Sequence, residues 1–211
     1  MSAIGAGRAS TVYDLGDGTV LRRQTERPED LEREASVMQY ARARGYPVPE
    51  VVAVRRDGLV LERIEGPTML ADIRRRPWRM REHVRVLAAL QKRLHLIEAP
   101  PGLRRAGDGT QLIHLDFHPE NVLLSPAGPV VIDWTNARCG DPPLDVAMTW
   151  VIGATSAGLL GRLLTRWYLA EHDFAPVRAA LPLAGERRIA DPNVTDEERA
   201  RVRRLVARRG V

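Results

Sequence analysis

The chain has 211 residues, of which 44% are hydrophobic and 28% are charged, proportions typical of a soluble globular protein. This length allows either one large domain or two small lobes. A single cysteine excludes an internal disulfide framework and is typical of a reducing compartment. No run approaches the roughly 18 apolar residues of a membrane span, and no signal peptide is visible. The composition therefore predicts a soluble, cytoplasmic protein that does not enter a membrane.

Basic residues outnumber acidic residues by 32 to 27, which gives a formal net charge of +5 and an isoelectric point near 10.1. Only Lys92 is a lysine, so the basicity comes almost wholly from arginine. Aromatic residues make up only 5% of the chain, and no nucleic-acid reader motif or internal repeat is visible. These features argue against a nucleic-acid partner, and no partner protein is evident.

Two apolar segments, residues 4–13 and 19–24, flank an Asp-Gly turn and predict a β-hairpin. The first segment contains the G-x-G pair Gly5 and Gly7, followed by Ser10. A glycine-rich turn between strands lets backbone N–H groups approach a phosphate closely, because no Cβ blocks the way. No helix follows the pair, which argues against a dinucleotide-binding fingerprint. The pattern favours a glycine flap of the kind that covers phosphates in kinases.

A helix is predicted from Pro28, a preferred first-turn residue, to Gly45, a preferred helix stop. Glu34 lies beside its apolar face. In the strand before the helix, Val20 and Arg22 point to the same side by two-residue alternation. The apolar face of the helix comprises Leu31, Ala35, Met38 and Ala41.

Residues 48–54 and 57–64 predict two further strands, after which Gly66-Pro67 breaks the chain. We expect this break to divide an N-terminal lobe, residues 1–65, from a C-terminal lobe, residues 66–211. Beyond it the pattern becomes helical. Helices are predicted over residues 82–97, 142–152 and 159–171 and from residue 195 onward.

The most informative stretch, residues 113–133, reads I-H-L-D-F-H-P-E-N-V-L-L, a Gly/Pro turn, then V-V-I-D. Two short apolar strands joined by that turn predict a hairpin. The hairpin would hold Asp116, Asn121 and Asp133 near one another on one edge of a cleft. Two carboxylates and an amide oxygen are hard ligands, suited to Mg²⁺ and to the activation of a hydroxyl group. The pattern indicates a phosphotransferase.

The motifs G-x-G…V-Y, R-E-A, H-x-D-x-H-P-E-N, I-D-W and G-D-P-P-x-D occur in this order between about residues 4 and 150. Together they resemble the aminoglycoside phosphotransferase and choline kinase-like family. The resemblance implies an α+β, bilobal protein-kinase-like fold, with one helix on an N-terminal antiparallel sheet and a mainly helical C-terminal lobe. It also implies a small-molecule kinase that uses Mg²⁺ and ATP or GTP.

Within this resemblance, Asp116 corresponds to the catalytic base that orients and deprotonates the acceptor hydroxyl. Asn121 and Asp133 correspond to the ligands of Mg²⁺, which neutralises charge as the phosphoryl group leaves.

Four other positions correspond to supporting residues of the family. His114 would brace the catalytic loop, and His118 stands where the family commonly has histidine. Asp141 and Asp145 resemble positions that support the loop from outside the reaction centre.

The nucleotide would lie on the N-terminal lobe. Val20 would touch the adenine, Arg22 would replace the usual phosphate-binding lysine, and Glu34 would pair with that basic residue. The backbone of residues 62–64 would form the hinge that meets the purine. The implied nucleotide-binding residues are Gly5, Gly7, Ser10, Val20, Arg22, Glu34, Glu62 and Ile64.

Two alternatives stay open from the sequence. Arginine binds phosphate as a planar, permanently charged fork, so Arg22 is not a conservative replacement of lysine. A catalytically weak nucleotide-binding pseudokinase that acts through a partner is therefore the alternative to an active kinase. Residues 151–211 hold 11 arginines against 7 acidic residues, a net of +4. This balance disfavours a polycationic aminoglycoside and allows a neutral or anionic hydroxylated metabolite.

Overall fold

The computed structural model describes residues 2–6, 10–24, 28–156 and 158–209. The chain divides into two compact units. The first comprises Met1–Thr68 with Val122–Ala137, and the second comprises Met69–Asn121 with Arg138–Val211. The chain thus enters the second unit, returns to the first for a short segment, and leaves it again.

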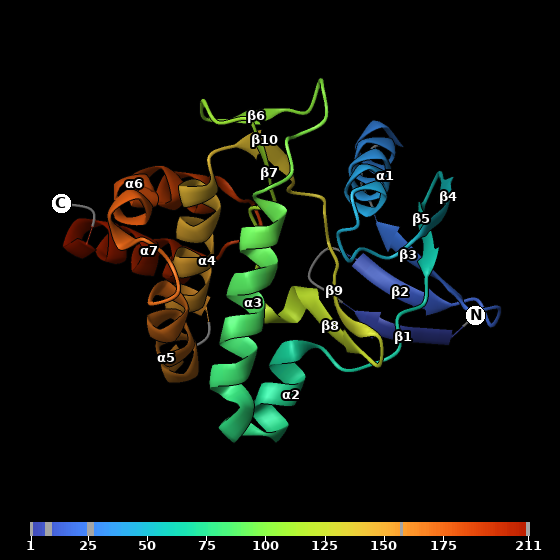
Figure 1. Cartoon of the computed structure of the whole chain (residues 1–211), viewed down its shortest axis with the longest axis horizontal. Helices are drawn as coiled ribbons and strands as arrows, with labels where there is room; N and C mark the ends of the chain where they lie inside the picture. Colours follow the sequence, from blue (N-terminus) through green and yellow to red (C-terminus); the bar gives the residue numbers. More distant parts are fainter. Residues whose placement is uncertain (1, 7–9, 25–27, 157, 210–211) are drawn as a thin grey trace. The chain divides into compact units, whose positions relative to one another are not determined.

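The first unit is built on a five-stranded antiparallel sheet with the strand order β1-β2-β3-β5-β4, and α1 is its helix (Figure 1). The β2–β3 hairpin confirms the predicted Asp-Gly turn, in which the Gly16 N–H donates to the Asp14 carboxylate at 2.9 Å. The strands are β1 (Ser2–Ala6), β2 (Ser10–Asp14), β3 (Thr19–Gln24), β4 (Val51–Arg55) and β5 (Gly58–Glu62).

The helix α1 spans Pro28–Ala43, as the sequence predicted within two residues of its end. Gly45 stops it with a φ of 74°, a left-handed conformation that favours glycine. The Gly45 N–H donates to the Arg42 carbonyl at 2.8 Å, which satisfies one of the open carbonyls at the helix end. The predicted apolar face is buried at Leu31, Ala35, Met38 and Ala41.

The strands β8 (Val122–Ser125) and β9 (Gly128–Val131) form the predicted hairpin and belong to the first unit. The hairpin lies against the chain at Gly66, where an added Cβ would come within 2.1 Å of the Leu124 carbonyl oxygen. Only glycine allows this approach, and its φ of 139° is also unfavourable for other residues. The Leu124 N–H donates to the Pro67 carbonyl at 2.9 Å. Gly66-Pro67 therefore contacts the β8–β9 hairpin directly, in addition to interrupting the regular secondary structure before α2.

The second unit is mainly helical (Figure 1, green to red). Four of its helices, α3, α4, α5 and α7, were expected from the sequence with shifted ends, and α6 was not expected. Its helices are α2 (Met69–Arg75), η1 (Pro77–Arg79), α3 (Met80–Leu94), η2 (Pro119–Asn121), α4 (Pro142–Ser156), α5 (Gly158–Leu169), α6 (Phe174–Ala190) and α7 (Asp196–Arg209).

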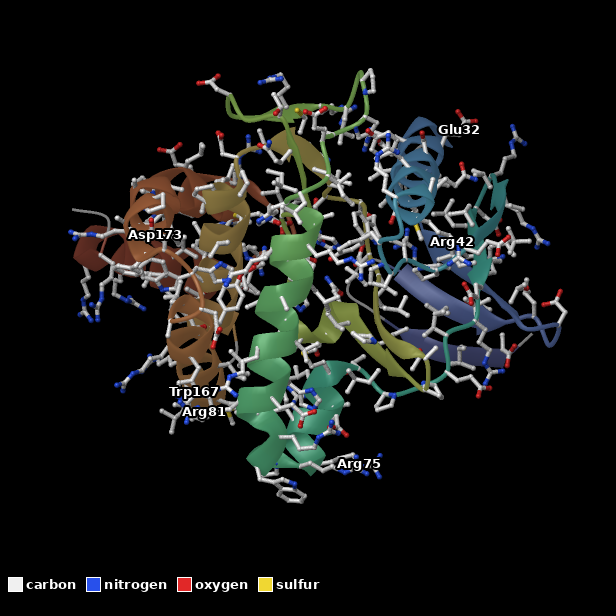
Figure 2. The ribbon with its side chains drawn as sticks, viewed as in Figure 1. Glu32, Arg42, Arg75, Arg81, Trp167 and Asp173 are labelled. Carbon is white, nitrogen blue, oxygen red and sulfur yellow. The ribbon has the colours of Figure 1, made fainter. Side chains whose placement is uncertain are left out.

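The apolar stripe of α3 buries Leu87, Leu90 and Leu94 as predicted, whereas Val86 is only half-buried. Ile97 of the same predicted stripe is buried beyond the end of the helix. On the outer side of this unit, the Arg81 guanidinium lies 5.4 Å from the ring centre of Trp167 on α5, a cation–π contact visible in Figure 2. Within the described residues, no helix is both long and apolar enough to span a membrane.

A small sheet with the order β6-β10-β7 completes the second unit. The strand β10 (Arg138–Gly140) runs parallel to β6 (Arg105–Ala106) and antiparallel to β7 (Gln111–Ile113). The sequence did not predict these strands. The sheet matters because β7 leads directly into the stretch that carries Asp116.

Candidate active site

The loop after β7 has a strained backbone next to Asp116. Leu115 has a φ of 63°, and it is one of two non-glycine residues with a positive φ in the described chain; the other is Asp133. Such strain costs about 1–3 kcal/mol per residue, persists only where the surroundings enforce it, and clusters at active sites. Here the Leu115 N–H is held by the buried Asp145 carboxylate at 2.6 Å. Both strained positions fall at or beside residues that the sequence predicted to be functional.

The Asp116 carboxylate is kept ionised by its neighbours. Burial raises its pKa, but the hydrogen bond and charge of His118 and the more distant charges of His114 and Arg188 outweigh burial and lower the pKa to about 2. The His118 Nε2 lies 3.4 Å from Asp116 Oδ1. Asp116 is therefore a carboxylate at any physiological pH.

Asn121 is bound to the same aspartate. Its Nδ2 lies 2.9 Å from the Asp116 carbonyl oxygen and 3.1 Å from Asp116 Oδ2, so it donates to both the backbone and the side chain. This orientation turns the amide oxygen of Asn121 away from Asp116, and within the described residues that oxygen accepts no hydrogen bond. The oxygen is thus available to a hard cation.

His114 and Asp145 support the loop that carries Asp116, as the resemblance implied, through contacts with the backbone N–H groups of Asp116 and Leu115. The Asp116 N–H lies 3.3 Å from His114 Nδ1, and the fully buried His114 ring packs edge-on against Phe117 at 5.5 Å. Asp145 on α4 also lies 2.8 Å from His95 Nε2, so each of its oxygens has a donor. Burial raises the pKa of Asp145, but the His95 hydrogen bond and charge, the charge of His114 and the Leu115 N–H lower it overall.

Asp141 lies at the start of α4, where its carbonyl accepts the Leu144 N–H at 3.0 Å. Its carboxylate packs tightly against the backbone of Gly109, where an added Cβ would lie 2.3 Å from Oδ1. This contact ties the start of α4 to the chain that precedes β7.

A second support for the catalytic loop was missed by the sequence analysis. The Thr149 hydroxyl on α4 donates to the Phe117 carbonyl at 2.8 Å, in the middle of the loop. Gln91 Nε2 on α3 approaches the same hydroxyl at 3.4 Å, and the Tyr168 hydroxyl on α5 donates to Gln91 Oε1. Three helices therefore converge on one loop carbonyl through buried polar groups. A buried threonine or glutamine gives no spacing signal, so the sequence pattern does not reveal them.

Asp133 lies in the first unit, directly after the β8–β9 hairpin, with a φ of 63°. Its carboxylate is half-exposed and lies 3.5 Å from Arg22 Nη1. Arg22 Nη2 forms a buried ion pair with Glu34 Oε2, so the expected pair between β3 and α1 is present. Val20, two residues earlier on β3, is buried in the sheet.

The predicted hinge follows β5. The Glu62 N–H donates to the Glu50 carbonyl at 2.9 Å, and the next amide, of Arg63, donates to the Gly18 carbonyl at 3.0 Å. Within the described residues the Ile64 N–H donates to no backbone carbonyl, so it is the hinge amide that a purine could bind. Arg42, which Figure 2 shows on α1, lies 3.3 Å from the Glu62 carboxylate and braces the hinge.

The predicted phosphate flap is only partly described. Gly7 lies outside the described residues, whereas Gly5 pairs with Val12 and Ser10 pairs with Gln24 in the sheet. Gly5 therefore lies in β1 and Ser10 at the start of the antiparallel strand β2. The predicted contacts of Gly5, Gly7 and Ser10 with phosphate stay predictions.

The donor set fits Mg²⁺ better than a transition metal. Within the described residues no group of three or more His, Cys, Asp or Glu side chains gathers as a preformed metal centre. Mg²⁺ typically binds through one or two protein oxygens together with nucleotide phosphates and water. The open amide oxygen of Asn121 and the half-exposed carboxylate of Asp133 suit that mode. Asn121 belongs to the second unit and Asp133 to the first, and their joint action stays a prediction.

Comparisons with known proteins identify the family and the fold of the chain. A model of the phosphotransferase enzyme family matches residues 1–91 and, in an overlapping second match, residues 61–181. No curated protein sequence matches the chain.

Solved structures resemble the whole chain. The crystal structure of aminoglycoside phosphotransferase APH(4)-Ia has a TM-score of 0.73 at 17% identity, with 100% of this chain and 93% of that chain covered. A thermostable mutant of that enzyme in a ternary complex with AMP-PNP and hygromycin B has a TM-score of 0.74 at 17% identity, covering 98% and 92%. A choline/ethanolamine kinase family protein from Mesorhizobium loti has a TM-score of 0.64 at 20% identity, covering 97% and 87%. At these identities the likeness shows the fold, which is protein-kinase-like.

Proposed function

The chain belongs to the phosphotransferase enzyme family, and from this membership we propose that it transfers the γ-phosphoryl group of ATP or GTP to a hydroxyl group of a small molecule. A solved relative of the same fold binds AMP-PNP and hygromycin B, which supports both a nucleotide donor and a small hydroxylated acceptor. A cytoplasmic location is part of the proposal, because the nucleotide supply and the single cysteine fit that compartment.

The observation that carries the proposal is the state of Asp116. A carboxylate with a pKa of about 2 is a weak base, so it does not remove the hydroxyl proton before the reaction. It orients the acceptor hydroxyl by accepting its hydrogen bond, and it takes the proton as the new P–O bond forms and the hydroxyl becomes acidic. His118 and Asn121 hold the carboxylate in place for this step.

On the donor side, Arg22, held by Glu34, would bind the nucleotide phosphates, and Gly5, Gly7 and Ser10 would cover them. Val20 and the hinge at Glu62 and Ile64 would bind the purine. Asn121 and Asp133 would supply oxygen ligands to Mg²⁺, which neutralises the charge of the β- and γ-phosphates when it is bound.

The first test is nucleotide binding followed by phosphoryl transfer. Mg-ATP or Mg-GTP should raise the melting temperature, because a ligand that binds only the folded state stabilises it. Asp116→Asn should keep this shift but lower phosphoryl transfer to a pool of hydroxylated metabolites by about 10³-fold, within the range for loss of a general base. Asp108→Asn, an exposed aspartate in the loop before β7, is the matched control and should leave transfer unchanged.

The outcomes separate the alternatives. If neither Mg-ATP nor Mg-GTP shifts the melting temperature, the nucleotide site is wrong. Nucleotide binding without transfer to any acceptor would instead assign the chain as a pseudokinase.

A further inference from the structure

The Glu34 carboxylate is the meeting point of three donors from separate parts of the first unit. Arg22 Nη2 on β3 forms the buried ion pair with Oε2. The Trp134 N–H donates to Oε1 at 2.9 Å, and the Thr135 hydroxyl donates to Oε2 at 3.1 Å. The Glu34 side chain is 1% exposed, so these donors hold a fully desolvated charge.

The two residues after Asp133 are therefore fixed while Asp133 itself reaches solvent. Trp134 is 1% exposed, and its Nε1–H donates to the Val131 carbonyl at 3.1 Å. Its ring centre lies 5.7 Å from that of Tyr46, with the two rings nearly perpendicular. The Asp133 side chain is 42% exposed and its φ of 63° is unfavourable for a residue with a Cβ. A conformation of this kind persists only when its neighbours enforce it.

Arginine at position 22 adds a link that lysine could not make in the same way. The guanidinium presents two terminal amino groups in a rigid fork, whereas an ammonium is one compact charge. Here Nη2 meets Glu34 and Nη1 lies 3.5 Å from Asp133 Oδ1, so one side chain spans both carboxylates.

We propose that Thr135 is a positioning residue for Asp133 and that the Arg22 fork completes the same clamp by tying the Asp133 carboxylate to Glu34. The clamp comprises Arg22, Glu34 and Thr135. This inference rests on the proposed function, because Asp133 is taken there as a ligand of Mg²⁺. In this role Arg22 is an adapted replacement of lysine, since the fork does more than contact phosphate.

The clamp acts on the backbone and on the carboxylate separately. The Thr135 hydroxyl fixes the chain just after Asp133 and so maintains its left-handed φ. Arg22 restricts the carboxylate to the side of Glu34. Loss of the hydroxyl should let the backbone relax, so that the Asp133 carboxylate occupies more positions. A cation that binds this carboxylate in one position should then bind more weakly.

The test is Thr135→Val, which removes the hydroxyl at nearly constant volume. Calorimetry should measure nucleotide binding as a function of Mg²⁺ concentration, so that no turnover is needed. We expect the Mg²⁺ concentration at half-effect to rise about threefold to tenfold, while nucleotide binding without Mg²⁺ stays unchanged. Removing a residue that holds a metal ligand typically lowers metal affinity about 10–100-fold. The effect expected here is smaller because Thr135 acts on Asp133 indirectly. Thr135→Ser, which restores the hydroxyl, should recover most of the loss.

Ser125→Ala is the matched control. At the far end of the same hairpin, its hydroxyl donates to the Gly128 carbonyl at 2.7 Å and accepts the Ala127 N–H at 3.2 Å. The variant therefore loses hydrogen bonds of the hairpin without touching the clamp. Its Mg²⁺ dependence should equal that of the wild type. A change in Ser125→Ala as large as that in Thr135→Val would mean that general loosening of the hairpin explains both, and would overturn the inference.

Arg22→Lys tests the other arm. The lysine can pair with Glu34 but cannot span both carboxylates. The clamp therefore predicts that Arg22→Lys needs a higher Mg²⁺ concentration for half of the effect on nucleotide binding than the wild type does. A lower concentration in Arg22→Lys would show that arginine is merely degenerate at this position.

Failure of the inference and failure of the proposed function are distinct. Wild-type protein that binds nucleotide with no effect of Mg²⁺ would contradict the proposed function. If Mg²⁺ strengthens nucleotide binding by the wild type, and the Thr135→Val variant shows the same Mg²⁺ dependence, only the clamp is contradicted.

Discussion

The two units hold their parts of the site by different chemistry. In the first unit, Asp133 depends on Glu34 and Arg22, a buried ion pair whose cation keeps its proton at any accessible pH. In the second unit, Asp116 depends on His118 and on a loop that Asp145 supports together with His95. The first unit thus relies on a buried pair of opposite charges, whereas the second relies on hydrogen bonds from imidazole and backbone donors to carboxylates.

The largest expected effect on stability comes from replacing the supporting carboxylate of each unit, Glu34 or Asp145, by the amide of the same shape. Glu34→Gln removes the buried counter-charge of the Arg22 guanidinium, which should cost about 3–5 kcal/mol in the free energy of unfolding. Asp145→Asn removes a carboxylate whose donors are the His95 imidazole and the Leu115 N–H, so the cost should be about 2 kcal/mol, that of unsatisfied buried hydrogen bonds. Urea unfolding of both variants measures the difference. Equal losses of stability in the two variants would contradict the comparison.

A smaller effect should follow from the second support of the catalytic loop. Thr149→Val removes the hydroxyl that binds the Phe117 carbonyl, leaving a buried acceptor unsatisfied at a cost of about 1–3 kcal/mol. We expect phosphoryl transfer to fall about tenfold as well, because the loop shifts relative to the acceptor.

Thr155→Val, one turn and a half further along α4, is the control for Thr149→Val. Among the residues that the structure describes, its hydroxyl bonds only within its own helix, to the Val151 carbonyl at 2.6 Å, so its loss should affect transfer little. A decrease in transfer of the same size in both variants would remove Thr149 from the support of the loop.

The smallest expected effect is a pH dependence confined to the second unit. Burial, followed by the charges of Lys92 and His95, lowers the pKa of His172 to about 4, with Asp145 acting in the opposite sense. Because the unfolded chain binds this proton below about pH 6.5 and the folded chain does not, stability should fall between about pH 6.5 and 4. His172→Gln should remove about 1 kcal/mol of that fall after allowance for solvent screening.

Urea unfolding at pH 7.0 and pH 4.5 measures this contribution as the difference between wild type and variant. The difference should change between the two pH values. If the two proteins lose stability in parallel, His172 is not the group responsible.

The sequence predicted the elements that local chemistry specifies. Pro28 and Gly45 bracket α1, the Asp-Gly turn forms the β2–β3 hairpin, and the run before Asp133 forms β8 and β9. The motif around Asp116 is recognisable for the same reason, since its residues are close together in the chain.

What the sequence did not reveal depends on distant contacts. The helix α6 was missed because Pro182 interrupts its pattern, although Asp173, whose carboxylate accepts the Ala175 N–H at 3.2 Å, was a readable start signal. The strands of the small sheet are two or three residues long, which is too short to show an alternation of apolar and polar residues. Thr135 and Thr149 act through single hydroxyl groups whose partners are 101 and 32 residues away.

The return of Val122–Ala137 to the first unit has a consequence for how the protein is made. During synthesis the sheet of Met1–Thr68 leaves the ribosome long before the hairpin that docks at Gly66 and supplies the Trp134 and Thr135 donors to Glu34. Until then Glu34 has only Arg22 as its partner among these groups, and the apolar surface that Trp134 covers is open. We expect the nascent N-terminal segment to stay incompletely folded, and open to chaperones, until residue 137 has emerged.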